Sequence, residues 1–268
     1  MIVDAHVHLF PERVFAAIWR WFDAHAWKIR YRMKAEEVIA FLTARGVDRL
    51  VGLAYSHAPG MARELNRFLA ELGRAHPQLI PLGTVLPGEP DAEAIVDEAF
   101  RLGLRGLKLH CHVQKIAADD PRLDPIYARA AQAGLPVVIH SGRAPCLSGY
   151  GIDPATLCSA EATRRALRRH PRLKLVVPHL GADEIEAHLA MLDEFEHLHL
   201  DTTMAVGGYL DLPLDPAALA RHADRILYGT DFPNLPYAWD RELLWLREHL
   251  PESAQKTILG ENALRLFA

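Results

Sequence analysis

The stretch Val137-Val138-Ile139-His140-Ser141-Gly142 decides the fold of this chain. Its first three residues are apolar in unbroken succession, and a histidine follows them directly. Unbroken apolarity, as opposed to alternation with polar residues, is typical of a parallel strand that is buried on both faces. We therefore expect a fully buried strand here, with His140 at its carboxyl end.

Short apolar runs of this kind recur along the whole chain. They cover residues 2–8, 49–55, 79–86, 106–110, 136–140, 174–179, 198–202 and 225–230. Amphipathic helical patterns lie between them, and Asp124-Pro125, Asp153-Pro154 and Asp215-Pro216 each pair an N-cap acid with a proline. Eight strands that alternate with helices predict an α/β fold, a closed (β/α)8 TIM barrel, with residues 1–268 as a single domain.

A doubly wound open sheet is the main alternative to the barrel. No G-x-G-x-x-G motif follows the first strand, which argues against the dinucleotide-binding form of that fold. The connection after the first strand, residues 10–34, is long and carries Trp19, Trp21 and Trp27. It is either a lid or pocket wall, or an outer helix that packs on the barrel or on a second subunit.

The composition of the chain excludes several classes of function. Its net charge is −4 with both signs interspersed and no basic run, so nucleic acid is not expected as a partner. No apolar stretch is long enough to span a membrane, and the first residues are typical of a strand rather than a signal peptide. Three cysteines without a CxxC pair fit a reducing cytoplasm. We expect a cytoplasmic protein that binds a small molecule.

Polar side chains gather at the carboxyl ends of the expected strands. In a parallel barrel these ends meet on one face, where the chemistry is done. His6 and His8 are two residues apart, so both side chains point the same way from a strand. The other strand-end residues of this kind are Lys108, His110, His140, His179 and Asp231.

Each of these residues has an ordinary explanation when it is taken alone. A His-x-His pair occurs by chance, a strand-end histidine is often a hydrogen-bonded core residue, and an aspartate before Phe-Pro is often a helix cap. Burying all of them at one barrel mouth, however, would cost free energy unless they bound a metal or served a reaction. Imidazole and carboxylate groups are the ligands of zinc-type sites, so the sequence predicts a divalent metal here.

The motifs at these strand ends resemble the amidohydrolase superfamily, and in particular its amidohydrolase-related (amidohydrolase 2) branch. The resemblance covers essentially the whole chain and implies the same TIM-barrel fold. The branch includes lactonases and metal-dependent decarboxylases. The motifs that carry the resemblance are Asp4-Ala5-His6-Val7-His8, Gly106-Leu107-Lys108-Leu109-His110, the histidines His140 and His179, Gly229-Thr230-Asp231 and Gly260-Glu261-Asn262-Ala263.

This resemblance also implies a ligand set. The residues expected to bind a single divalent metal, for which we expect zinc, are His6, His8, His140 and Asp231. His179 then either supports the metal ligands or acts as a catalytic residue. Binuclear relatives carry a carbamylated lysine at the end of strand four, so two ions are the alternative if Lys108 is carbamylated.

In the single-metal form, Lys108 and His110 are expected to bind an anionic group of the substrate. Arg143, in the loop after the fifth strand, is a further substrate-binding candidate; the alternative is a solvated loop arginine. Relatives are often dimers or larger, so the resemblance also allows a homo-oligomer.

The expected reaction is hydrolysis of an ester, lactone or amide bond in a small carboxylated substrate. A metal-activated water attacks, Asp231 acts as general base, and His179 polarises the scissile carbonyl. The alternative is a metal-dependent decarboxylase (lyase) acting on an aromatic or unsaturated carboxylic acid. Decarboxylase relatives usually have longer chains, so the 268 residues here favour hydrolysis. A non-catalytic barrel is the least favoured hypothesis, because every expected site residue is present.

Overall fold

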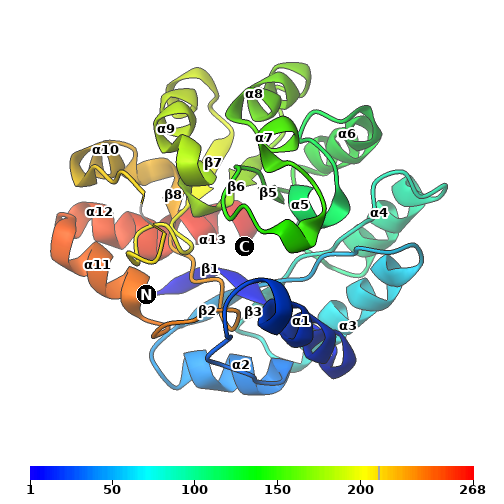
Figure 1. Ribbon diagram of the computed structural model, residues 1–268, viewed down its shortest axis with the longest axis horizontal. Coiled ribbons are helices and arrows are strands. Elements are labelled where there is room, and N and C mark those ends of the chain that lie inside the picture. Colours follow the sequence, from blue (N-terminus) through cyan, green and yellow to red (C-terminus); the bar gives the residue numbers. More distant parts are fainter. Residues whose placement is uncertain (211) are drawn as a thin grey trace.

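A ring of parallel strands forms the centre of the molecule, and helices surround it (Figure 1). The computed structural model describes residues 1–210 and 212–268, and its architecture confirms the predicted TIM barrel. The strands are β1 (Val3–His8), β2 (Arg49–Leu53), β3 (Leu79–Pro81), β4 (Leu107–His110), β5 (Val137–His140), β6 (Leu175–Val177), β7 (Leu198–Asp201) and β8 (Ile226–Leu227).

The strands pair in chain order in two ladders, β1-β2-β3 and β4 to β8. Backbone hydrogen bonds join the ladders at both seams. At one seam Gly83 N–H donates to Gly106 O at 2.8 Å and Lys108 N–H donates to Gly83 O at 2.7 Å. At the other, Ala5 N–H donates to Tyr228 O and His8 N–H donates to Phe232 O, both at 2.8 Å. Several strands are shorter than the apolar runs that predict them, yet these bonds make the ring continuous.

The helices follow the strands around the outside of the ring. They are α1 (Glu12–His25), α2 (Ala35–Thr43), α3 (Met61–Ala75), α4 (Ala92–Arg101), α5 (Cys111–Gln114), α6 (Asp124–Ala133), α7 (Pro154–Leu157), α8 (Ala160–Arg169), α9 (Ile185–Glu194), α10 (Pro216–Arg221), α11 (Arg241–His249), α12 (Glu252–Lys256) and α13 (Asn262–Phe267). Shorter helical turns are η1 (Pro121–Leu123), η2 (Ser148–Tyr150), η3 (Pro178–Glu184), η4 (Ala223–Arg225) and η5 (Thr257–Glu261). Among the described helices, none combines the length and apolarity needed to span a lipid bilayer.

Two of the three predicted aspartate caps are present. Asp153 accepts from Ala155 N–H at 3.0 Å, and Asp215 accepts from Ala217 N–H at 2.9 Å. Asp124 differs, because it lies inside the first turn of α6. Its carboxylate instead accepts a hydrogen bond from His170 Nε2 at 2.8 Å, which ties α6 to the end of α8.

The barrel interior is apolar at the amino-terminal ends of the strands. Inward-facing residues such as Val51, Leu82 and Val138 form one buried cluster with Leu266 and Phe267 of α13. Each such side chain contributes roughly 1.5–3 kcal/mol when fully buried. The C-terminal helix thus closes one end of the barrel with side chains, and the buried polar groups lie toward the other end.

Helix α1 belongs to the long connection of residues 10–34. Its buried Phe15 and Phe22 anchor it, and it contacts η2, where Trp21 lies 4.7 Å from Tyr150 between ring centroids. Trp27, just after the helix, donates its indole N–H to Asn234 O at 2.8 Å. This segment is therefore part of the wall above the strand ends, as one of the two interpretations of its sequence expected.

Candidate metal centre

Three of the predicted ligands meet at the carboxyl ends of β1 and β8. One ligand atom from each of His6, His8 and Asp231 lies within 4.8 Å of the others. His8 Nε2 is 2.9 Å from Asp231 Oδ1, and His6 Nε2 is 3.5 Å from the same oxygen. The two histidines reach the same side because side chains two apart on a strand share a face.

Asp231 is held in a left-handed backbone conformation, with φ at 76°. Such a conformation costs a non-glycine residue about 1–3 kcal/mol and is found where the surroundings determine it. Here Asp231 N–H donates to His6 O at 3.0 Å, and Asp231 O accepts from Asn234 N–H at 2.9 Å. Burial by itself raises the pKa of Asp231, but the imidazoles of His8 and His6 outweigh it and hold that pKa well below its usual range. The carboxylate is therefore ionised.

Asp201, at the end of β7, orients His6 and was not identified from the sequence. Its Oδ2 lies 2.8 Å from His6 Nδ1, and its Oδ1 accepts from the backbone N–H of His179 at 3.1 Å. Burial raises the pKa of Asp201, but His6 offsets this and the pKa falls to about 2. Burial and then Lys108 lower the pKa of His6 to about 4. A neutral His6 that donates from Nδ1 to Asp201 has its lone pair on Nε2, and a metal bound there would replace the contact of this nitrogen with Lys108 Nζ.

His179 and His140 form a second pair of histidines, at the ends of β6 and β5. His179 begins four successive residues with positive φ that extend to Ala182. Its Nδ1 lies 2.8 Å from Thr203 O, which can only accept, so Nδ1 carries the proton. Its Nε2 lies 3.0 Å from His140 Nδ1 and must then accept that hydrogen bond. Burial lowers the pKa of both histidines, so both are neutral and His140 Nε2 is left with a free lone pair.

Lys108 and His110 come from β4 and lie against these histidines. Lys108 Nζ is 3.3 Å from His6 Nε2, and the side chain is 1% exposed. Burial lowers the pKa of Lys108 to about 8. The His110 ring stacks on His140 with centroids 4.2 Å apart. Lys108, His110 and the four histidines described above line one small cavity of about 40 Å³. Asp231, Tyr55 and Tyr150 line it as well, and we call it the metal cavity.

A family model described as Amidohydrolase matches residues 3–268. The chain belongs to the amidohydrolase family. This family lies within the superfamily of metal-dependent enzymes that the sequence motifs resemble. No functionally curated protein matches the sequence.

Solved structures share the fold of this amidohydrolase at low sequence identity. An uncharacterised TIM-barrel protein from Bordetella bronchiseptica is 22% identical, with a TM-score of 0.78 over 99% of this chain and 97% of its own. The 5-carboxyvanillate decarboxylase of Novosphingobium aromaticivorans, solved with manganese and 4-hydroxy-3-methoxy-5-nitrobenzoic acid, is 17% identical, with a TM-score of 0.70 over 100% and 96%. A probable 2-pyrone-4,6-dicarboxylic acid hydrolase from Acinetobacter baumannii is 14% identical, with a TM-score of 0.65 over 99% and 98%. The structures that share this fold thus include a decarboxylase and a probable hydrolase.

The residues of the amidohydrolase fit a divalent cation. His140 Nε2 is buried and has no hydrogen-bond partner within the described residues, and it belongs to the wall of the cavity that His6, His8 and Asp231 also line. An unpaired buried lone pair costs free energy, and coordination of a cation would remove that cost. His140 is outside the compact group formed by His6, His8 and Asp231, in keeping with its bond to His179.

Arg143 lies away from this cavity in the amidohydrolase. Its guanidinium forms ion pairs with Asp183 at 2.9 Å and Glu184 at 3.7 Å, and the side chain is 37% exposed. The structure thus joins Arg143 to loop carboxylates, whereas it places Lys108 and His110 on the cavity wall. Asp183 and Glu184 belong to a different βα connection from Arg143, so no local pattern in the sequence predicts these ion pairs.

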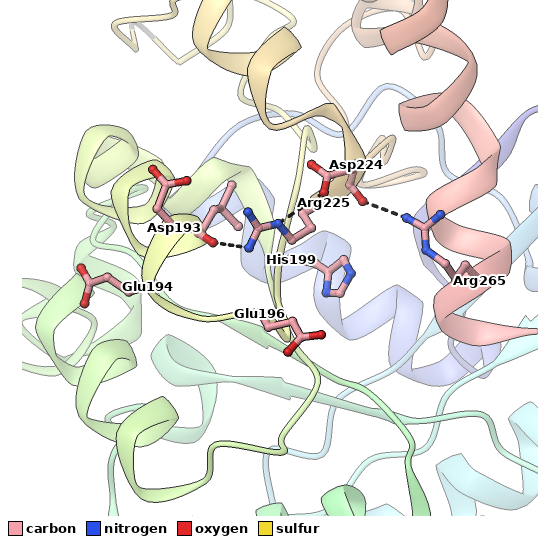
Figure 2. Close-up of a pocket in the computed structure, with 8 residues that line it drawn as sticks. Asp193, Glu194, Glu196, His199, Asp224, Arg225 and Arg265 are labelled. Carbon is pink, nitrogen blue, oxygen red and sulfur yellow. Dashed lines mark hydrogen bonds and ion pairs between the residues drawn. The ribbon is translucent and has the colours of Figure 1, made fainter.

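A larger cavity, of about 730 Å³, lies at the amino-terminal ends of β7 and β8 (Figure 2). Charged side chains line it, but its arginines are bound to protein groups. Arg225 donates to Leu192 O, and Arg265 donates to Asp224 O at 2.9 Å. These bonds tie loops together at the end of the barrel opposite to the metal centre, so we place the chemistry in the smaller cavity.

Proposed function

We propose that this amidohydrolase is a metal-dependent hydrolase that cleaves an ester, lactone or amide bond in a small carboxylated substrate. The observation that carries the proposal is the convergence of metal-binding lone pairs on one cavity. His6 and His140 each donate from Nδ1 and so keep an unprotonated Nε2, while Asp231 adds an ionised carboxylate. Lys108, on the same wall, offers a cation for a substrate carboxylate.

The residues that would hold the ion, for which we propose a single zinc, are His6, His8, His140 and Asp231. When bound, such an ion lowers the pKa of a water toward about 7, so that hydroxide is available at neutral pH. A two-metal form would need a carbamylated Lys108. The lysine is buried and its pKa is lowered to about 8, which raises the fraction of neutral amine that carbamylation needs.

The side chains around the ion have separate tasks in this proposal. Asp231 accepts the proton of the attacking water and later returns it to the leaving group. His179 keeps its Nδ1 proton in the hydrogen bond to Thr203 O, so only its Nε2 can take up a proton and donate to the developing oxyanion, and to do so it must leave the hydrogen bond that it accepts from His140 Nδ1. Lys108 and His110 orient the substrate carboxylate. Arg143 has a role only if it leaves Asp183.

Decarboxylation of an aromatic acid is the second candidate. A pocket of about 440 Å³ adjoins the metal cavity, and its lining includes Trp21, Phe22, Tyr55 and Tyr150. Such a lining suits an aromatic substrate. In this reaction Asp231 would deliver a proton to the carbon that loses CO2.

Metal analysis and two assays test the proposal. Protein purified without chelator should carry about one equivalent of zinc, and two equivalents would support the carbamylated form. The zinc-loaded protein should cleave members of a panel of aryl esters, lactones and amides, and Asp231→Asn should abolish cleavage, while Asp193→Asn, at the opposite end of the barrel, should not. Release of CO2 from aromatic acids without any hydrolysis would replace the proposal with the second candidate.

A further inference from the structure

One face of α1 forms one wall of the pocket beside the metal cavity. The α1 residues of this wall recur at helical spacing, and the rest of the lining comes from the segment after β2, from α5 and the residue after it, and from η2. The volume is about 440 Å³, compared with the roughly 150 Å³ of an apolar cavity that holds a benzene ring. The lining residues of α1 are Val14, Ala17, Ile18, Trp21 and Phe22.

The pocket and the metal cavity share walls. Phe22, Tyr55 and Tyr150 line both. Tyr55 also packs edge-on against His110, with centroids 5.0 Å apart. A molecule whose reacting group lies in the metal cavity would therefore extend past these three rings into the pocket.

The apolar face of α1 is only partly buried against the barrel. Phe15 and Phe22 are buried and fix α1 on the barrel, whereas Ile18 and Trp21 remain partly exposed along the pocket. Water in contact with such surface costs about 25 cal/mol per Å², which a ligand ring would recover. Trp21 and Tyr150 are large side chains with few rotatable bonds, so they bind a ring at low cost in entropy.

One cation, Lys115, lines the pocket without lining the metal cavity. Lys115, at the end of α5, is exposed and has left-handed backbone angles, φ 55° and ψ 49°. Its ammonium reaches across to the loop after η2, where a Cβ added to Gly151 would be 3.8 Å from Nζ. Within the described residues, no carboxylate forms an ion pair with this ammonium, so it is available to pair with an anionic ligand.

We propose that this pocket is a substrate subsite that binds an apolar group of aromatic-ring size, with Lys115 pairing to an anionic group that this ring carries. The inference rests on the proposed function, because it names the substrate class of the same site. The substrate is then an elongated molecule with the reacting group at the metal, a ring against α1, and a second anion beside Lys115.

Calorimetric binding to the full chain, both zinc-loaded and stripped with chelator, tests this inference. The probes are butanoate, 4-phenylbutanoate and 4-(4-carboxyphenyl)butanoate, which add first the ring and then the second anion. We expect 4-phenylbutanoate to bind at least tenfold more tightly than butanoate. Ala17→Trp should remove that difference by filling the pocket, whereas Ala24→Trp, on the exposed side of α1, should keep it.

The charge is tested separately. Lys115→Met should weaken binding of the two-carboxylate probe about three- to fivefold and leave 4-phenylbutanoate unchanged, in keeping with an exposed ion pair. Lys174→Met, at the other end of the barrel, should change the affinity of neither probe. Equal affinities of butanoate and 4-phenylbutanoate, or equal effects of the two tryptophan variants, would overturn the subsite. If this pattern holds while no ester, lactone or amide is cleaved, the subsite stands and the proposed reaction is wrong.

Discussion

His140 Nδ1 lies 3.0 Å from His179 Nε2, and this bond sets the tautomers of both rings. Because His179 Nδ1 donates to Thr203 O, His179 Nε2 accepts and His140 Nε2 is left as a free lone pair. A histidine outside the proposed ligand set thus decides whether its neighbour can bind a metal.

Replacement of His179 by asparagine should weaken metal binding as well as catalysis. The asparagine is too short to hold His140 in its present tautomer, so we expect zinc affinity to fall about tenfold or more. A chelator-competition titration measures the loss. His249→Asn, on the exposed face of α11, is the control. Unchanged zinc affinity in His179→Asn would show that Thr203 and His179 do not set the state of His140.

Asp201→Asn tests the orientation of His6. The amide keeps the volume of the side chain but removes the negative charge that accepts the hydrogen bond from His6 Nδ1, which lies 2.8 Å from Asp201 Oδ2. We expect a loss of metal affinity of roughly 10- to 100-fold, the usual effect of removing such a partner. The chelator-competition titration measures this loss, and Asp193→Asn, the control, should keep the metal affinity of the unmodified protein. Zinc binding by Asp201→Asn that equals that of the unmodified protein would refute this role.

Glu242 should make the stability of the protein depend on pH. Burial raises its pKa from 4.5 to about 8, although a hydrogen bond from Tyr237 at 2.5 Å opposes the shift. Because the folded-state pKa lies above the unfolded value, the stabilisation is fully present below pH 4.5 and is lost as the pH rises through about 8. The loss is on the order of 5 kcal/mol, at about 1.36 kcal/mol for each unit of pKa.

Glu242→Gln cannot ionise and should therefore raise the melting temperature at pH 9 and change it little at pH 5. Thermal unfolding at both pH values measures the difference from the unmodified protein. Glu248→Gln, an exposed residue of the same helix, should show no such contrast. An equal response of the two variants at pH 9 would argue that Glu242 is not protonated in the fold.

Gly181→Ala should destabilise the turn that carries His179. A Cβ at Gly181 would overlap the imidazole of His188, and the backbone φ is 84°. Gly103 has a similar φ of 88° but nothing within 4 Å of an added Cβ. We expect Gly103→Ala to cost about 1 kcal/mol from the backbone conformation alone, and Gly181→Ala to cost about 3 kcal/mol or more because the imidazole must also move. Urea unfolding compares the two, and equal costs would rule out the steric contact.

The sequence alone determined the barrel and most of the polar residues at its mouth. Unbroken apolar runs mark strands that are buried on both faces, and the two-residue repeat of a strand places His6 and His8 on one side. These properties depend on neighbours in the chain, so they can be predicted without a structure.

The tertiary structure decided which of those residues touch. Asp201 meets His6 across 195 positions, and Arg143 turns to Asp183 rather than to the cavity. The pocket along α1 likewise arises only where that helix lies over the strand ends. Such contacts follow from the closure of the ring, which brings together residues whose spacing in the chain carries no periodic signal.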